Sequence, residues 1–191
     1  MRCFIAVPLP EILSKNIGQY QSSLKKKLSS SDMKISWTRL ASIHLTLRFL
    51  GEIEADTVSE INRRLSHELP LCPATQIEVK GVGAFPNLQK PRIMWAGLKT
   101  NQQLHDLHSL IKEQLSKLPR EADDKAFKPH LTLGRVRFDP TRGRAFIQAT
   151  KDSLLHEFGA LPVEEVRLYR SHLKQSGPEY EILSSWTLAK Q

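Results

Sequence analysis

The chain has 191 residues, which is enough for one domain with a sizeable core. Hydrophobic residues make up 40% of it and charged residues 25%, which excludes wholesale disorder, and no apolar run is long enough to span a bilayer. The formal charge of +8 favours a polyanionic partner such as nucleic acid.

Strands and helices are predicted along the whole chain. In chain order, hydrophobic periodicity predicts a strand at 2–7, a helix at about 13–28, a strand at 43–49, a helix at about 58–69, strands at 76–82 and 91–98, a helix at about 104–118, a strand at 130–137, a helix at about 145–158, and strands at 163–170 and 180–188. Stretches rich in Gly and Pro predict hairpin connections at 83–91 and 174–179. Because Cys3 and Cys72 do not form a disulfide framework and Pro8 interrupts the first apolar run, we expect a cytoplasmic protein without a signal peptide.

An internal duplication is suggested by the order of these elements. After the first strand, the order helix, strand, helix, strand, strand occurs twice. The tetrapeptide His-Leu-Thr-Leu occurs in both copies, at 44–47 and at 130–133, and a tryptophan, Trp95 or Trp186, lies near the end of each. We therefore expect residues 1–191 to form a single domain of two pseudo-symmetric lobes, with one motif in each lobe.

The two repeated strands each place polar side chains on one face. Residues two apart in a strand share a face, so His44, Thr46 and Arg48 are expected on one side of the first strand. In the second strand, Lys128, His130 and Thr132 form the corresponding stripe. Arg135 is expected on the opposite face unless the strand bulges after Gly134, which makes it a weaker candidate.

Two facing histidines suit the hydrolysis of a cyclic phosphodiester. This reaction needs a base to activate water on one side of phosphorus and an acid to protonate the leaving ribose oxygen on the other side. Histidine can serve in both roles near neutral pH. The hydroxyls of Thr46 and Thr132 can donate hydrogen bonds to the phosphate oxygens, and Arg48, Lys128 and Arg135 are candidate substrate contacts.

The sequence also resembles a known family. Both H-x-T-x motifs match the two-histidine (2H) phosphoesterase superfamily, and within it the RNA 2′,3′-cyclic phosphodiesterases, also called 2′-5′ RNA ligases. The resemblance extends over nearly the whole chain, through the segments RCFIAVPLP, HLTLRFLGE, PRIMWAGL, FKPHLTLGRV, YRSHL and GPEYEIL.

This resemblance implies a fold, an activity and roles for both histidines. The fold is α+β and bilobal, with two antiparallel sheets, helices on the outside and a central basic cleft. The activity is metal-independent hydrolysis of RNA 2′,3′-cyclic phosphate ends to 2′-phosphomonoesters, without a cofactor, and with reversible 2′-5′ ligation as a second reaction. His44 is the proton donor and His130 the proton acceptor. We expect a monomer that binds RNA ends and needs neither a membrane nor a protein partner.

Three other interpretations of the motifs compete with this one. A metal-dependent phosphodiesterase would use the histidines as ligands, but neither motif contains a carboxylate or cysteine as a third ligand. A non-catalytic RNA-binding module could bind the RNA backbone with Lys and Arg alone, so the presence of both histidines and both threonines weighs against it. A Ser nucleophile is disfavoured because the sequence contains no G-x-S-x-G motif, and a Cys nucleophile because Cys3 and Cys72 have no local sign of activation. His105 and His108, at helical spacing, could form a separate metal site, although ordinary packing explains both.

Overall fold

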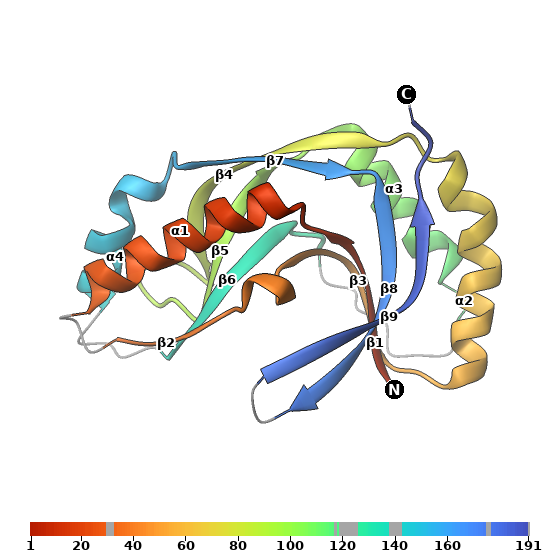
Figure 1. Cartoon of the computed structure of the whole chain (residues 1–191), viewed down its shortest axis with the longest axis horizontal. Helices are drawn as coiled ribbons and strands as arrows, with labels where there is room; N and C mark the ends of the chain where they lie inside the picture. Colours follow the sequence, from red (N-terminus) through yellow and green to blue (C-terminus); the bar gives the residue numbers. More distant parts are fainter. Residues whose placement is uncertain (30–32, 117, 119–125, 138–142, 175–176, 191) are drawn as a thin grey trace.

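The computed structural model of this chain describes residues 1–29, 33–116, 118, 126–137, 143–174 and 177–190 (Figure 1). Its strands are β1 (Arg2–Pro8), β2 (Lys34–Trp37), β3 (His44–Glu52), β4 (Thr75–Phe85), β5 (Ile93–Lys99), β6 (His130–Arg137), β7 (Glu157–Val163), β8 (Glu165–Lys174) and β9 (Gly177–Thr187). Its helices are α1 (Glu11–Leu28), α2 (Ala55–Glu68), α3 (Gln102–Gln114) and α4 (Gly143–Thr150), with short 3-10 turns η1 (Leu40–Ser42), η2 (Leu69–Leu71) and η4 (Lys151–Ser153). The predicted α+β class is confirmed.

All of the described strands belong to one curled antiparallel sheet. Its order is β7-β4-β5-β6-β3-β1-β8-β9, and β2 pairs with residues 134–137 at the end of β6. β3 and β6 are joined at one position, where Leu45 pairs with Leu131. The two predicted sheets are therefore two halves of one sheet, which meet at the strands that carry the repeated motif.

The halves of the sheet do not correspond to the two sequence copies. β8 and β9, from the end of the chain, extend the half that contains β1 and β3, whereas β4 and β5 pair with β6 and β7 in the other half. The two tryptophans are not equivalent either. Trp95 pairs with Thr132, but Trp186 pairs with the buried Val166 and donates its indole N–H to Ser66 of α2. The two pseudo-symmetric lobes thus remain a prediction. The correspondence between the copies is clearest at the motif strands β3 and β6.

Helices cover the leucine side of the motif strands. α1 and α4 lie together over the half that contains β7, and α2 and α3 lie over the half that contains β3 and β9 (Figure 1). Apolar residues from all of these elements form one core, which includes Leu45, Leu47, Leu131 and Leu133. Within the described residues, no helix is long and apolar enough to cross a membrane.

The fourth predicted helix is too long. α4 ends at Thr150, and residues 157–163, partly assigned to this helix from their periodicity, form β7 and pair with β4. Leu154 and Leu155, which contribute to that periodicity, are 55% and 76% exposed, so the pattern does not mark a buried helical stripe. Pairing with β4 therefore overrides the local preference.

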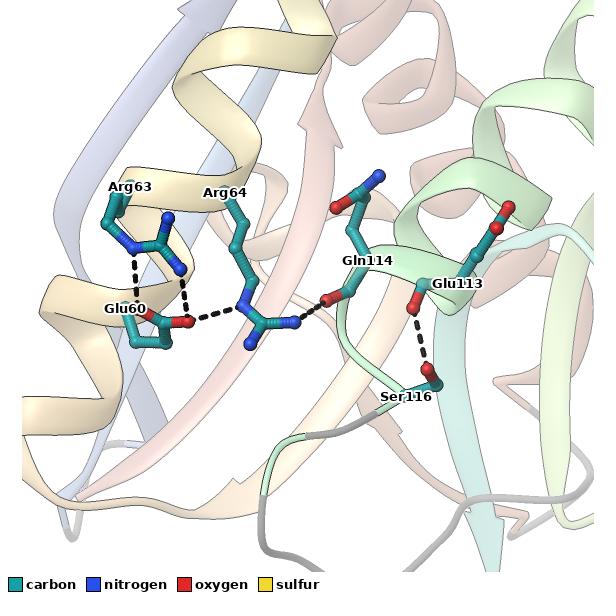
Figure 2. A network of polar contacts seen from close by, with 6 residues as sticks. All are labelled: Glu60, Arg63, Arg64, Glu113, Gln114 and Ser116. Atoms are coloured by element: carbon teal, nitrogen blue, oxygen red, sulfur yellow. Dashed lines mark hydrogen bonds and ion pairs between the residues drawn. The ribbon is translucent and has the colours of Figure 1, made fainter.

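A polar network links α2 to the end of α3. The guanidinium of Arg64 donates to Glu60 Oε1, one turn earlier on α2, and to the backbone oxygen of Gln114 at 2.9 Å (Figure 2). Arg63 also donates to Glu60, at 2.8 and 2.7 Å. The contact with Gln114 occupies a carbonyl that the end of a helix would otherwise leave without a partner, and it fixes the two helices behind β3 and β9.

Candidate active site

The two His-Leu-Thr-Leu motifs lie side by side at the junction of the sheet. Because Leu45 is paired with Leu131, the residues on either side of each leucine, His44 and Thr46 in β3 and His130 and Thr132 in β6, lie on the same side of the sheet. The leucines between them are fully buried, and the histidines and threonines are half-buried on the other side. We call this side of the sheet the histidine face. It brings together all four residues predicted from the motifs.

The same backbone contact holds both imidazole rings. His44 Nδ1 lies 3.0 Å from the carbonyl oxygen of Ser42, and His130 Nδ1 lies 2.7 Å from that of Lys128, in each case two residues earlier. A carbonyl can only accept, so Nδ1 carries the proton and donates it. In the neutral ring this leaves Nε2 as the basic nitrogen. Both histidines are therefore in the tautomer in which Nε2 is available for proton transfer.

His44 lies in an aromatic environment. Its ring stacks on Phe4 at a centroid distance of 4.6 Å and contacts the edge of Tyr180 at 5.3 Å. Phe4 in turn stacks on Tyr169 at 5.2 Å. Burial lowers the pKa of His44 from 6.5 to about 4; the hydrogen bond to Ser42 opposes this shift, and the charge of His130 adds to it. The last contribution indicates that the two rings lie close enough to interact electrostatically.

His130 has a smaller aromatic neighbourhood. Phe85 packs edge-on against it at 5.0 Å, and Trp95 lies 5.4 Å from Phe85. Trp95 also lies over Gly83, where a Cβ atom would clash with the indole. Glycine at this position therefore lets the indole lie against the strand beside the histidine.

A bulge follows the threonine in each motif strand. In the β1–β3 ladder, Ala6 pairs with Thr46 and Ile5 with Arg48, so Leu47 is an extra residue. In the β5–β6 ladder, Trp95 pairs with Thr132 and Met94 with Gly134, so Leu133 is the extra residue. An extra residue reverses the alternation of the side chains that follow it.

These bulges exchange the places predicted for the two arginines. Arg48 pairs with Ile5, which belongs to the main core, and its positive charge acts on His108 of α3. The prediction that Arg48 shares the face of His44 is therefore wrong. Arg135 is exposed and its charge acts on Tyr180, which touches His44, so it lies on the histidine face. Phe49, paired with Phe4, holds the matching position in β3.

The second bulge is stabilised from the core side. The carbonyl oxygen of Leu133 accepts hydrogen bonds from Gln21 Nε2 at 2.9 Å and from the backbone N–H of Thr38 at 3.0 Å. Gln21 also donates to the carbonyl oxygen of Thr38 at 3.0 Å. Its side chain is 5% exposed, so these bonds are formed away from water. Gln21 of α1 thus stabilises the bulge in β6 that directs Arg135 to the histidine face.

The loop before β6 is supported by α3. Lys128 is exposed and precedes the strand, and its carbonyl, rather than its ammonium group, makes the described contact with His130. Next to it, Phe127 stacks on His108 at 3.9 Å with an interplanar angle of 6°. Burial is the main cause of the lowered pKa of His108. This histidine therefore has a packing role.

The described residues contain no group of three or more His, Cys, Asp or Glu side chains placed to hold a metal ion. His105 contacts Thr100 and the edge of Phe127, next to the stacked His108. The alternative of a metal site at His105 and His108 thus gains no third ligand from the described part of the chain.

Sequence reasoning did not assign a role to Phe4 or Tyr180, two of the aromatic residues around His44. Phe4 and Tyr180 lie in segments that the resemblance includes, RCFIAVPLP and GPEYEIL, but a single aromatic in a strand is ordinarily read as core. The pairing of β1 with β3 and β8 brings Phe4 to the histidine face, and the pairing of β8 with β9 brings Tyr180 there.

The chain is similar to known proteins over nearly its whole length. The model of the family described as LigT like Phosphoesterase matches residues 7–95 and 98–180. A protein of Methanocaldococcus jannaschii named RNA 2′,3′-cyclic phosphodiesterase is 32% identical over 97% of this chain and 100% of its own length. A protein of the same name from Archaeoglobus fulgidus is 35% identical, over 96% of this chain and 98% of its own length.

Solved structures show the same fold. A crystal structure of a Thermus thermophilus protein superposes with a TM-score of 0.82 at 27% identity and covers 100% of both chains. The structure of E. coli LigT complexed with 3′-AMP gives a TM-score of 0.75 at 22% identity, over 98% of this chain and 97% of that one. The second similarity concerns the fold alone.

Proposed function

This chain belongs to the LigT-like phosphoesterase family, and we propose that it hydrolyses the 2′,3′-cyclic phosphodiester at RNA ends to a 2′-phosphomonoester, with His44 and His130 as acid and base. The observation that carries this proposal is the pairing of Leu45 with Leu131, which sets the two H-x-T-x motifs against each other on one face. The names of the relatives support the reaction class.

The proposed reaction moves two protons. Neutral His130 takes a proton from water through Nε2 as the water oxygen bonds to phosphorus. The bond between phosphorus and O3′ breaks, and protonated His44 gives its Nε2 proton to O3′. The products are a 2′-phosphomonoester and a 3′-hydroxyl. The two rings are held by the same kind of contact, so their hydrogen bonds do not distinguish the acid from the base. The assignment of His44 as acid and His130 as base is the one that the family resemblance implies.

The neighbouring residues would stabilise the charge that develops on phosphate. Thr46 and Thr132 lie two residues after the histidines on the same face and can donate to the non-bridging oxygens. Arg135, on the same face, adds a positive charge. If an RNA 5′-hydroxyl replaced water, the same two proton transfers would form a 2′-5′ linkage, which is the ligation that the resemblance implies.

Histidine variants test the proposal. We expect His44→Ala and His130→Ala each to lower the hydrolysis of an oligonucleotide ending in a 2′,3′-cyclic phosphate by at least about a hundredfold. His67→Ala is a matched control, because His67 lies on α2 with 81% of its side chain exposed. Activity close to wild type in either motif variant would refute the assignment.

Two further measurements separate the proposal from its alternatives. Chromatography of the product should identify the 2′-monoester, and activity should survive treatment with EDTA. Activity that is lost with EDTA and restored by zinc would favour a metal-dependent phosphodiesterase. RNA binding without any turnover would favour a binding module.

A further inference from the structure

The hairpin of β8 and β9 extends beyond the strand that it pairs with. β1 pairs with residues 167–170 of β8, but the ladder between β8 and β9 continues to the pair of Lys174 and Gly177. One side of this extension continues the histidine face, because Tyr169 pairs with Phe4 and the alternation then brings Ser171 and Leu173 to the same side. Across the ladder, Tyr180 and Ile182 lie on that side too.

The two sides of the hairpin differ in chemistry. On the reverse side, Lys174 Nζ lies 2.5 Å from Glu179, and His172 Nε2 lies 2.8 Å from Glu181, which Arg170 also approaches at 3.7 Å. Its charged groups are thus largely satisfied by one another. On the histidine face, Leu173 is 76% exposed and Ile182 is 51% exposed, so this side of the hairpin presents apolar side chains to solvent.

Arginines surround this apolar surface. Burial raises the pKa of Tyr180, and the positive charges of Arg135, Arg2 and Arg39, which lower it, show that all three lie near the phenol. Arg39 stands directly before η1, and its guanidinium donates a hydrogen bond to the carbonyl oxygen of Pro178 at the start of β9. A guanidinium has five N–H donors, so this contact leaves others for a ligand.

We propose that this surface, formed by Leu173, Tyr180, Ile182 and Arg39, binds the nucleotides on the 5′ side of the cyclic phosphate. The aromatic ring of Tyr180 offers a stacking surface for a base, the exposed Leu173 and Ile182 extend the apolar surface beside it, and the neighbouring arginines match the phosphates of a single strand. The inference rests on the proposed function, since the cyclic phosphate lies at the 3′ end of its RNA and all remaining nucleotides lie on its 5′ side. The preferred substrate is then an oligoribonucleotide rather than a cyclic mononucleotide.

Substrate length provides the first test. We expect the wild-type kcat/KM to be at least about tenfold higher for a tetranucleotide ending in a 2′,3′-cyclic phosphate than for the corresponding cyclic mononucleotide. Ile182→Ser and Arg39→Gln should reduce this ratio severalfold, and the glutamine introduced by the second substitution would retain an N–H donor for Pro178. The Arg39→Gln variant should also weaken the salt dependence of the tetranucleotide reaction by about one unit of logarithmic slope.

Matched controls lie away from the histidine face. Leu155→Ser removes an exposed leucine before β7, and Arg170→Gln removes an arginine from the reverse side of the same hairpin. Both should keep the wild-type ratio, and thermal melts should show that all four variants are folded. A wild-type ratio near one, or an equal loss in the controls, would overturn the inference while hydrolysis of the mononucleotide still supported the proposed function.

Binding provides a test that does not depend on turnover. A tetranucleotide carrying a 5′ fluorophore and ending in a 2′-monophosphate should bind the wild-type chain, measured by fluorescence anisotropy. Ile182→Ser and Arg39→Gln should weaken this binding severalfold, and Leu155→Ser and Arg170→Gln should not. Unchanged binding in the first pair would overturn the inference even if the chain hydrolysed nothing.

Discussion

Arg135 and Phe49 occupy equivalent positions, each five residues after a motif histidine, and both lie on the histidine face because a bulge precedes them. An uninterrupted strand would direct both side chains to the core side. The pair also shows where the motif strands diverge: one supplies an aromatic ring at this position and the other supplies a positive charge.

The exchange of the arginines predicts different effects for their variants. Arg135→Gln should lower kcat/KM by about 10- to 100-fold, because a charge-assisted hydrogen bond to phosphate is worth about 1.5–3 kcal/mol. Arg48→Gln should leave kcat/KM within about threefold of wild type and change mainly the stability, since Arg48 lies on the face of Ile5. Steady-state kinetics and urea unfolding of both variants would check this, and the reverse order of effects on kcat/KM would contradict the placement.

The low pKa of His44 predicts a difference between two pH profiles. In the free protein this pKa is about 4, chiefly through burial, so a protonated His44 is a minor species at neutral pH. A bound phosphodiester brings a negative charge that raises it. The descending limb of kcat should therefore lie at higher pH than that of kcat/KM, and both profiles should be bell-shaped and report the coupled pair. Rates measured between about pH 4 and 9 that rose throughout would argue against His44 as the acid.

The same shift predicts how stability depends on pH. Because the folded pKa lies below the unfolded value of 6.5, the unfolded chain takes up the proton first as pH falls, and the folded state loses stability between about pH 6.5 and 4. The lowering from 6.5 to about 4 corresponds to about 3 kcal/mol. Urea unfolding at about pH 7 and 4 should show a larger loss for the wild type than for His44→Gln. Equal losses would mean that His44 is not buried in its neutral form.

The sequence predicted the motif pair but not the path of the strands after it. His44, Thr46, His130 and Thr132 follow from a two-residue alternation that holds as far as each threonine. The bulges at Leu47 and Leu133 arise from pairing with β1 and β5, strands distant in sequence, so local periodicity could not place Arg48 or Arg135. Nor could it show that β8 and β9 cross to the half that contains His44, because strand order is set by tertiary contacts.

A buried side chain behind the sheet predicts coupling to the site. Replacing Gln21 by Leu removes its hydrogen bonds to the carbonyl oxygens of Leu133 and Thr38. The oxygen of Leu133 keeps the backbone N–H of Thr38 as a donor. We expect a loss of about 1–3 kcal/mol in the free energy of unfolding. Ser22→Ala is the control, because Ser22 is exposed and donates its hydroxyl to the carbonyl oxygen of Gly18 in its own helix.

Gln21→Leu should also weaken catalysis through Arg135. If the bulge at Leu133 directs Arg135 toward the histidine face, then Gln21→Leu should lower kcat/KM in the wild-type background but have little effect in an Arg135→Gln background. A double-mutant cycle on kcat/KM measures this coupling, and wild-type pH profiles in the single variant would show that the histidines remain in place. Fully additive effects would mean that Gln21 stabilises the fold without orienting Arg135.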